Sequence, residues 1–168
     1  MSAHIKLDEL DAIVFDFDGV LTDNKVLIDS SGNEWVSCHR GDGLAFDVFR
    51  FMGVKTYILS TEKNPVVSVR AKKLQVPLIQ GISNKSKTLE KLAQDNNLQL
   101  SRVLYIGNDL NDFRAMKLCG FSACPSDSHF RIKEIASIKL KTAGGAGIVR
   151  ELLEDVMNID IIQTLYPE

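Results

Sequence analysis

Short apolar runs alternate with amphipathic stretches along almost the whole chain. Runs rich in Val, Ile, Leu and aromatic residues predict buried strands, and apolar residues recurring every three to four positions predict helices. The predicted strands cover 11–17, 54–60, 77–81, 102–108, 121–125 and the short run 137–140. The predicted helices cover 43–53, 64–76, 84–97, 110–120, 126–136 and a last helix from about residue 145.

The order of these elements predicts an α/β fold. Strands that alternate with helices form a mostly parallel sheet, doubly wound in the Rossmann-like manner. Residues 25–38 differ, because they read as two short strands around the turn 30–33 and so predict a β-hairpin. No repeat or linker divides the chain, and we expect one domain over residues 1–168. Ligands of such sheets bind beyond the carboxyl ends of the strands.

Composition narrows the class of protein. The net charge is −2 and the basic residues are dispersed, which gives no sign of a nucleic-acid groove or a membrane surface. The three cysteines show neither metal-binding nor disulfide spacing, as is typical of a reducing compartment. No apolar run approaches the roughly 20 residues of a membrane span. We expect a cytoplasmic protein that binds neither nucleic acid nor a membrane.

Polar residues follow four of the predicted strands. Taken singly, each has an ordinary interpretation: an aspartate at a strand end is usually a turn or cap residue, and a lysine is usually solvated. Four such signals in order, each after its own strand, favour a functional site instead. They are Asp16 with Asp18, Ser60 with Thr61, Lys85, and Gly107-Asn108-Asp109 with Asp112.

The two aspartates suggest a chemistry. Asp16 and Asp18 are two positions apart, so in an extended chain their side chains point the same way. Two such carboxylates repel unless a cation lies between them, and Mg²⁺ prefers oxygen ligands. One aspartate can attack phosphorus and form an aspartyl-phosphate, while the second transfers protons. Further oxygen ligands are offered by Asn108, Asp109 and Asp112.

The stretch DFDGVLTD at 16–23 matches the motif DxDGxxTD of the haloacid-dehalogenase-like phosphatase superfamily. The chain resembles this superfamily over essentially its whole length. The resemblance implies that Asp16 is the nucleophile and Asp18 the general acid and base, with Mg²⁺ bound by Asp16 and the Asp18 backbone carbonyl. It assigns the phosphoryl oxygens to Ser60, Thr61 and Lys85.

The short spacing between motifs leaves room for a hairpin but not for a cap domain. With GISNK and GGAGIVRE, the chain is similar to the capless phosphatases of 3-deoxy-octulosonate 8-phosphate and nonulosonate 9-phosphate. That resemblance implies a homotetramer in which neighbouring subunits cover each site and the hairpin flap, 25–38, lies in an interface. A hairpin packed on its own domain is the alternative. Similar domains accompany acylneuraminate cytidylyltransferases, which implies such a partner.

The residues after the second motif bear on the substrate. Glu62, with Lys73 eleven residues later, resembles the nonulosonate pattern, whereas octulosonate enzymes typically carry an arginine. We therefore expect Glu62 and Lys73 to contact the sugar, and the alternative is that both are surface helix charges. Arg40 and Arg150 are further candidates for substrate binding.

Two departures from the family pattern leave alternatives open. Asn108 stands where an aspartate is common, so either Asn108 binds Mg²⁺ or Asp109 and Asp112 replace it through water. Thr61 replaces a glycine and narrows the pocket.

We expect a Mg²⁺-dependent phosphatase of an acidic sugar. The alternatives are a phosphatase of broader specificity and a weakly active regulatory or tetramerisation module. A response-regulator receiver domain is a further option, but it has no use for the second aspartate.

Overall fold

A computed structural model describes residues 5–168, so the first four residues of the predicted 1–168 domain lie outside the described part. The strands are β1 Ala12–Phe15, β2 Leu27–Ile28, β3 Glu34–Trp35, β4 Thr56–Leu59, β5 Leu78–Ile79, β6 Val103–Ile106, β7 Phe121–Cys124 and β8 Ile138–Lys139. The helices are α1 Gly41–Phe51, α2 Val66–Leu74, α3 Lys85–Asp95, α4 Phe113–Leu118, α5 Phe130–Ile135, α6 Ile148–Glu151 and α7 Ile161–Leu165.

Six strands form one parallel sheet in the order β5-β4-β1-β6-β7-β8. β1 lies in the middle and pairs with β4 and β6, so Ile13 is opposite Thr56 on one side and Leu104 on the other. The strand order reverses direction at β1, which places the sheet's switch point beside the first motif. The predicted α/β class is confirmed, and this sheet is parallel throughout.

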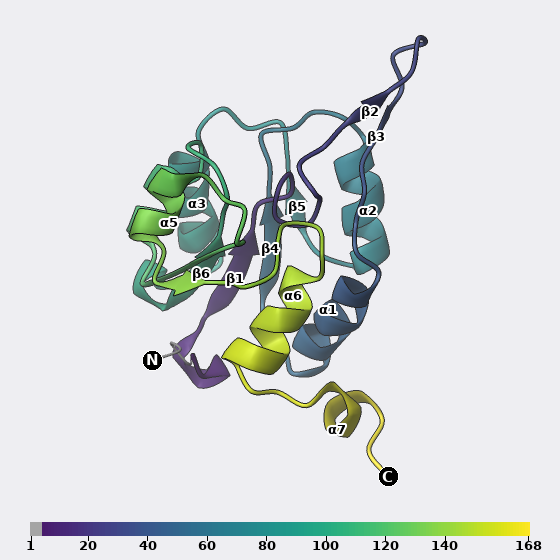
Figure 1. Ribbon diagram of the computed structural model, residues 1–168. Coiled ribbons are helices and arrows are strands. Elements are labelled where there is room, and N and C mark those ends of the chain that lie inside the picture. Colours follow the sequence, from purple (N-terminus) through teal and green to yellow (C-terminus); the bar gives the residue numbers. More distant parts are fainter. Residues whose placement is uncertain (1–4) are drawn as a thin grey trace.

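Helices cover both faces of the sheet (Figure 1). Alternate residues of β1 belong to two cores, with Ile13 and Phe15 on one side and Ala12 and Val14 on the other. The first core is closed by α1, α2, α6 and α7, and the second by α3, α4 and α5. All four β1 residues are fully buried, which explains why the strand reads as a continuous apolar run.

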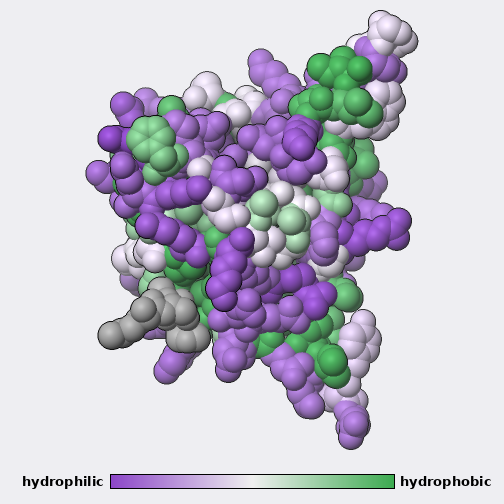
Figure 2. Space-filling model, viewed as in Figure 1, coloured by the Kyte–Doolittle hydropathy of each residue, from purple (hydrophilic) through white to green (hydrophobic). Residues whose placement is uncertain are grey.

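The predicted hairpin is present, and it projects from the body of the molecule (Figure 1). Its strands are only two residues long and pair antiparallel, with Leu27 opposite Trp35. Apolar side chains gather on it, and they are exposed in the described chain (Figure 2). The exposed fractions are 51% for Val26, 69% for Leu27, 62% for Ile28 and 49% for Trp35. A hydrogen bond ties β3 to the loop between β4 and α2, from Asn64 Nδ2 to Glu34 Oε2 at 3.1 Å.

Several helix predictions needed correction. Helices α4 and α5 begin at Phe113 and Phe130, three and four residues after the expected positions 110 and 126. The helix expected from Asn64 begins two residues later at Val66, with Pro65 before it, although Asn64 Oδ1 does accept a hydrogen bond from Val66 N at 3.0 Å. The helix expected to be the last passes into a π-helical turn, Leu152–Val156, which ends with Met157 as its C-cap. The chain then turns at Asn158, whose φ is 55°.

A further helix, α7, then follows. Its N-cap is Asp160, whose Oδ1 accepts from Ile162 N and Gln163 N. Only Ile161 of its five residues is buried, so the sequence carried too little periodicity to predict it. Across residues 5–168, no helix combines the length and the apolar character needed to cross a membrane.

Candidate active site

The polar residues that the sequence singled out lie together at the carboxyl edge of the sheet. β4, β1 and β6 are neighbours, so the residues that follow them lie side by side. Asp16 directly follows β1, Ser60 follows β4, and Asn108 follows β6 after one glycine. Lys85 reaches the same edge from the first position of α3, after β5. All four of these residues are buried.

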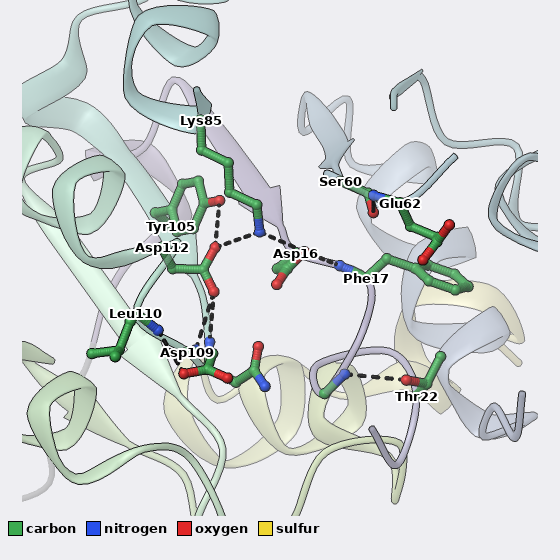
Figure 3. Close-up of polar contacts among 12 residues, drawn as sticks. Asp16, Phe17, Thr22, Ser60, Glu62, Lys85, Tyr105, Asp109, Leu110 and Asp112 are labelled. Atoms are coloured by element: carbon green, nitrogen blue, oxygen red, sulfur yellow. Dashed lines mark hydrogen bonds and ion pairs between the residues drawn. The ribbon is translucent and has the colours of Figure 1, made fainter. Parts of the chain in front are cut away.

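Lys85 joins two aspartates at the centre of the site (Figure 3). Its Nζ lies 2.7 Å from Asp16 Oδ1 and 2.6 Å from Asp112 Oδ1. The lysine side chain is 1% exposed, so this is an ion-pair triad shielded from water. Burial lowers the pKa of Lys85, but the two carboxylates outweigh burial and raise the pKa above its ordinary value. The two carboxylates therefore favour the charged form of Lys85.

Asp112 accepts hydrogen bonds from several protein groups besides Lys85. Its Oδ1 also accepts the Tyr105 hydroxyl at 2.9 Å, and its Oδ2 accepts Asn108 N at 2.9 Å and Asp109 N at 3.3 Å. Both carboxylate oxygens are thus occupied by the protein itself. Asp112 fixes the loop after β6 and orients Lys85, and it would have to give up these bonds to ligate a metal directly.

Three oxygen-bearing groups meet beside this triad. The Asn108 side-chain amide faces Asp18 O at 2.9 Å and Asp16 Oδ2 at 3.2 Å. With the amide turned over, its nitrogen would donate to both of these acceptors, so one orientation satisfies the contacts within the protein and the other offers a third oxygen to a cation. A carboxylate, a backbone carbonyl and an amide oxygen suit Mg²⁺, a hard cation with oxygen ligands. Within residues 5–168 no group of three or more His, Cys, Asp or Glu forms a metal cluster, so the fit depends on this mixed set.

Gly19 permits this close approach. Its φ is 79°, and a Cβ at this position would lie 1.9 Å from the Asn108 amide nitrogen. The backbone N–H of Gly19 donates to Thr22 Oγ1 at 3.1 Å, and Asn24 N donates to the same oxygen at 3.2 Å. The glycine and threonine of the first motif therefore shape the loop that presents the Asp18 carbonyl.

The two aspartates of the first motif differ in environment. Burial raises the pKa of Asp16 well above its usual range, Asp112 adds to this, and Lys85 opposes it. Burial also raises the pKa of Asp18, assisted by the negative charge of Glu62 and opposed by Lys85. Asp18 is only partly buried and has no ion-pair partner among the described residues. A partly exposed carboxyl with a raised pKa is suited to proton transfer.

The loop after β4 carries the next group of candidates. Ser60 is buried, and its Oγ accepts Glu62 N at 3.1 Å. Thr61 is exposed and lines the cavity over the aspartates. Glu62 Oε1 accepts Lys63 N at 2.6 Å and Asn64 N at 2.8 Å, so this carboxylate also holds the loop that leads into α2.

The other substrate candidates lie apart from this cluster. Lys73 is exposed in the last turn of α2 and lines neither cavity at the carboxyl edge. Arg40 is exposed just before α1. Arg150 pairs with Glu154 on its own helical segment, Nε at 3.1 Å and the terminal nitrogen at 3.0 Å. The structure thus brings Glu62 to the site and leaves these three basic residues outside it within one chain.

A cavity of about 260 Å³ lies over the aspartates. It is lined by Asp16, Asp18, Asn24, Thr61, Asn108, Asp109, Leu110 and Asn111. Sequence reasoning missed Asn24 and also missed Tyr105, which is fully buried and donates to Asp112. A tyrosine inside a predicted core strand was an available signal, because its hydroxyl needs a partner when buried.

This geometry can be compared with known proteins. The model of the haloacid dehalogenase-like hydrolase family matches residues 52–152. The chain belongs to this family and is a hydrolase. Among curated relatives, the 3-deoxy-D-manno-octulosonate 8-phosphate phosphatase of Salmonella typhi is 31% identical over 161 residues, which are 92% of this chain and 84% of the relative. The enzyme is accordingly of the phosphatase type.

A second relative is much longer. N-acylneuraminate cytidylyltransferase A of Danio rerio is 29% identical over 143 residues, and these make up 83% of this chain but 33% of that protein. The chain therefore spans about a third of the length of this relative.

Solved structures agree with the fold. A HAD family hydrolase from Streptomyces avermitilis superposes with a TM-score of 0.88 and 41% identity, covering 90% of this chain and 87% of that one. The octulosonate phosphatase of Moraxella catarrhalis, solved with a magnesium ion, a phosphate ion and a KDO molecule, has a TM-score of 0.84 and 28% identity. It covers 90% of each chain. The resemblance seen in the sequence is confirmed.

Proposed function

We propose that this protein is a Mg²⁺-dependent, capless phosphatase that hydrolyses the phosphate monoester of an acidic sugar. The observation that carries the proposal is the buried set at the carboxyl edge: Lys85 between Asp16 and Asp112, with the Asp16 carboxylate, the Asp18 carbonyl and the Asn108 amide converging beside it. With two carboxylates and one ammonium ion, the buried triad has a net charge of −1 when fully ionised, and a divalent cation would reverse that sign. A phosphate dianion would then meet an attractive field.

The residues divide the chemistry between them. Asp16 attacks phosphorus, so a bond forms from its carboxylate oxygen to phosphorus while the bond from phosphorus to the sugar oxygen breaks. Asp18 gives its proton to the leaving sugar oxygen. Asp18 then takes a proton from water, which attacks the aspartyl-phosphate and releases inorganic phosphate and free Asp16. Ser60, Thr61 and Lys85 are the proposed contacts of the phosphoryl oxygens.

Mg²⁺, when bound, would neutralise the phosphoryl charge and draw the phosphate toward Asp16. Its proposed ligands are Asp16, the Asp18 carbonyl and Asn108. Asp109 and Asp112 are proposed to take part through water, because Asp112 is already bound by Lys85 and Tyr105.

We further propose a preference for a nonulosonate 9-phosphate over a 3-deoxy-octulosonate 8-phosphate. Glu62 supports this, because its charge acts on Asp18 and so lies near the leaving group. Its second carboxylate oxygen is available to accept hydrogen bonds from sugar hydroxyls. Lys73 lies outside both cavities of its own chain, so it would contact the far end of the sugar only in a site formed between two protomers.

Phosphate release measured with Mg²⁺ and with EDTA on both sugar-acid phosphates tests the function and the preference together. We expect hydrolysis that depends on Mg²⁺ and a higher kcat/KM for the 9-phosphate. Glu62→Ala and Lys73→Ala should each lower that kcat/KM about ten- to a hundredfold, the cost of a charged hydrogen bond of roughly 1.5–3 kcal/mol. Hydrolysis of para-nitrophenyl phosphate should barely change, because this ester has no sugar hydroxyl or carboxylate for Glu62 and Lys73 to bind.

The neighbouring lysine on α2 provides the control, and Lys72→Ala should leave both substrates unaffected. Equal losses on the sugar and the generic ester would mean that Glu62 and Lys73 support the loop or the metal site. A higher kcat/KM for the octulosonate in the wild type would exclude the nonulosonate preference.

Assembly is the next proposal. The hairpin exposes four large apolar side chains, and we propose that they pack in a homotetramer whose neighbours cover each site. Light scattering at micromolar concentration should give about four times the chain mass of 18.7 kDa. Leu27→Ser with Trp35→Ser should dissociate it, whereas Phe51→Ser, at an aromatic residue 72% exposed on α1, should not. A monomeric wild type would sink the proposal.

A second candidate function is a weakly active regulatory or tetramerisation module beside a sugar-acid cytidylyltransferase. The similarity to a third of the zebrafish cytidylyltransferase favours it, as does Asn108 in place of a more common aspartate. If the protein hydrolysed no sugar-acid phosphate but still formed a tetramer, the regulatory or tetramerisation function would be favoured. In either case we propose a cytoplasmic protein that acts on small molecules rather than nucleic acid or membranes.

A further inference from the structure

A second cavity, of about 480 Å³, opens beside the cavity over the aspartates. The two share Thr61, Leu110 and Asn111 in their walls, so they adjoin along one side. Their combined space falls in the range of small-molecule sites, which are typically about 300–1,000 Å³. One ligand can therefore extend from the phosphoryl position into the second cavity.

The two cavities have opposite charge. The aspartate cavity is lined by Asp16, Asp18 and Asp109 and by no basic residue. The second cavity is lined by three basic residues and by no acidic one. Those three are Lys85, Arg114 and Arg131. The first cavity requires a cation before it can hold an anion, whereas the second already carries the positive charges of Arg114 and Arg131.

The arginines are the available cations of the second cavity. Lys85 is already engaged by Asp16 and Asp112. Arg114 is exposed in the first turn of α4 and has no ion pair within the described chain. Arg131, on α5, has only a loose contact with Glu134, from Nε to Oε2 at 3.6 Å, and both side chains are more than half exposed. Such a contact contributes little and yields to a better partner.

The rest of the lining suits a sugar chain. Leu110 and Phe113 offer apolar surface for C–H groups, while Ser83, Ser86 and Asn111 offer hydroxyl and amide groups. A guanidinium binds a carboxylate through two parallel hydrogen bonds, which makes an arginine pair a selective contact for an acid group.

We infer that this cavity is a carboxylate-binding subsite, in which Arg114 and Arg131 hold the acid group of the substrate while its phosphate lies over Asp16. The inference rests on the proposed phosphatase function and adds the residues that select an acid over a neutral sugar. Within one chain it gives the carboxylate a partner that Lys73, outside both cavities, does not provide.

The test compares a sugar-acid phosphate with its own primary amide at the acid carbon. The acid is whichever of the 8-phosphate and 9-phosphate the wild type hydrolyses faster, and para-nitrophenyl phosphate reports on the phosphate position alone. We expect the wild type to prefer the acid over the amide by about ten- to a hundredfold in kcat/KM. Arg114→Met with Arg131→Met should bring that ratio to about one, with para-nitrophenyl phosphate hydrolysis within about twofold of the wild type.

Lys91→Met removes one positive charge from the exposed body of α3 and is the matched control, which should keep the wild-type ratio. Both arginines are exposed, so the double variant should fold, and its melting temperature checks this. An acid preference that survives in the double variant overturns the inference. An equal loss of kcat/KM on para-nitrophenyl phosphate also overturns it, because the two arginines would then act on the phosphoryl group.

Hydrolysis rates of the wild type alone distinguish a failure of the carboxylate subsite from a failure of the phosphatase function. Equal hydrolysis of acid and amide would overturn the subsite and leave the phosphatase function standing. Hydrolysis of none of the three esters would overturn the phosphatase function, and the subsite with it.

Discussion

Replacing Asp16 with asparagine is expected to abolish turnover, lowering kcat by at least about 10³-fold. An amide cannot attack phosphorus, and it also removes a negative charge from the proposed Mg²⁺ ligands. The fold should survive, because the amide oxygen can still accept the Phe17 N–H that Asp16 Oδ1 accepts at 2.7 Å. Phosphate release from the sugar-acid phosphate and the circular dichroism spectrum measure the two expectations.

The neighbouring aspartate provides a matched comparison. Asp18→Asn keeps the nucleophile but loses the proton donor, so para-nitrophenyl phosphate, which has a good leaving group, should release one equivalent of nitrophenolate and then stop. Asp16→Asn should give no burst. If Asp16→Asn kept a substantial part of the wild-type rate with Mg²⁺, the aspartyl-phosphate mechanism would be wrong.

Replacing Lys85 with methionine is expected to remove activity and to lower the free energy of unfolding by about 3–5 kcal/mol in EDTA. The reason is that Asp16 and Asp112 are buried and lose the cation that lies 2.7 and 2.6 Å from them. Urea unfolding, followed by circular dichroism in EDTA, measures the change.

Lys87→Met is the control, since Lys87 is exposed in the same first turn of α3 and should change stability by no more than about 0.5 kcal/mol. Mg²⁺ should restore part of the stability lost in Lys85→Met by supplying a cation to Asp16. Unchanged stability of Lys85→Met in EDTA would show that proton uptake by the aspartates, and not the ion pairs, balances the buried charge.

The sheet was predictable because its strands are buried on both faces. The run 102–108 contains β6, whose four residues are all buried, so the apolar signal was unbroken. α7 was not predictable, because one buried residue in five gives no period. The hairpin was predictable from its turn residues. The length of its two strands was not, because the apolar residues that extend the pattern are exposed and make few contacts that would fix the pairing.

The site was partly predictable for a similar reason. Residues that follow neighbouring parallel strands must meet at one edge, which placed Asp16, Ser60 and Asn108 together before any coordinates. The sequence could not show that Asp112 would be fully bound by the protein, because its partners come from the distant Lys85 and from Tyr105. The pairing of Arg150 with Glu154 follows from their i,i+4 spacing on a helix, and it was missed because Arg150 was assigned to the substrate by resemblance.

The central position of β1 has a consequence for how the chain is made. β1 is the first strand of the sheet to be synthesised, yet one of its edges waits for β4 and the other for β6, which ends at Ile106. Until then an apolar strand has an unpaired edge, the feature through which nascent chains aggregate. The long separation between partners also slows folding, because two long loops must close before the sheet is stable. A ribosome-bound fragment ending before β6 should therefore be sensitive to protease and dependent on chaperones.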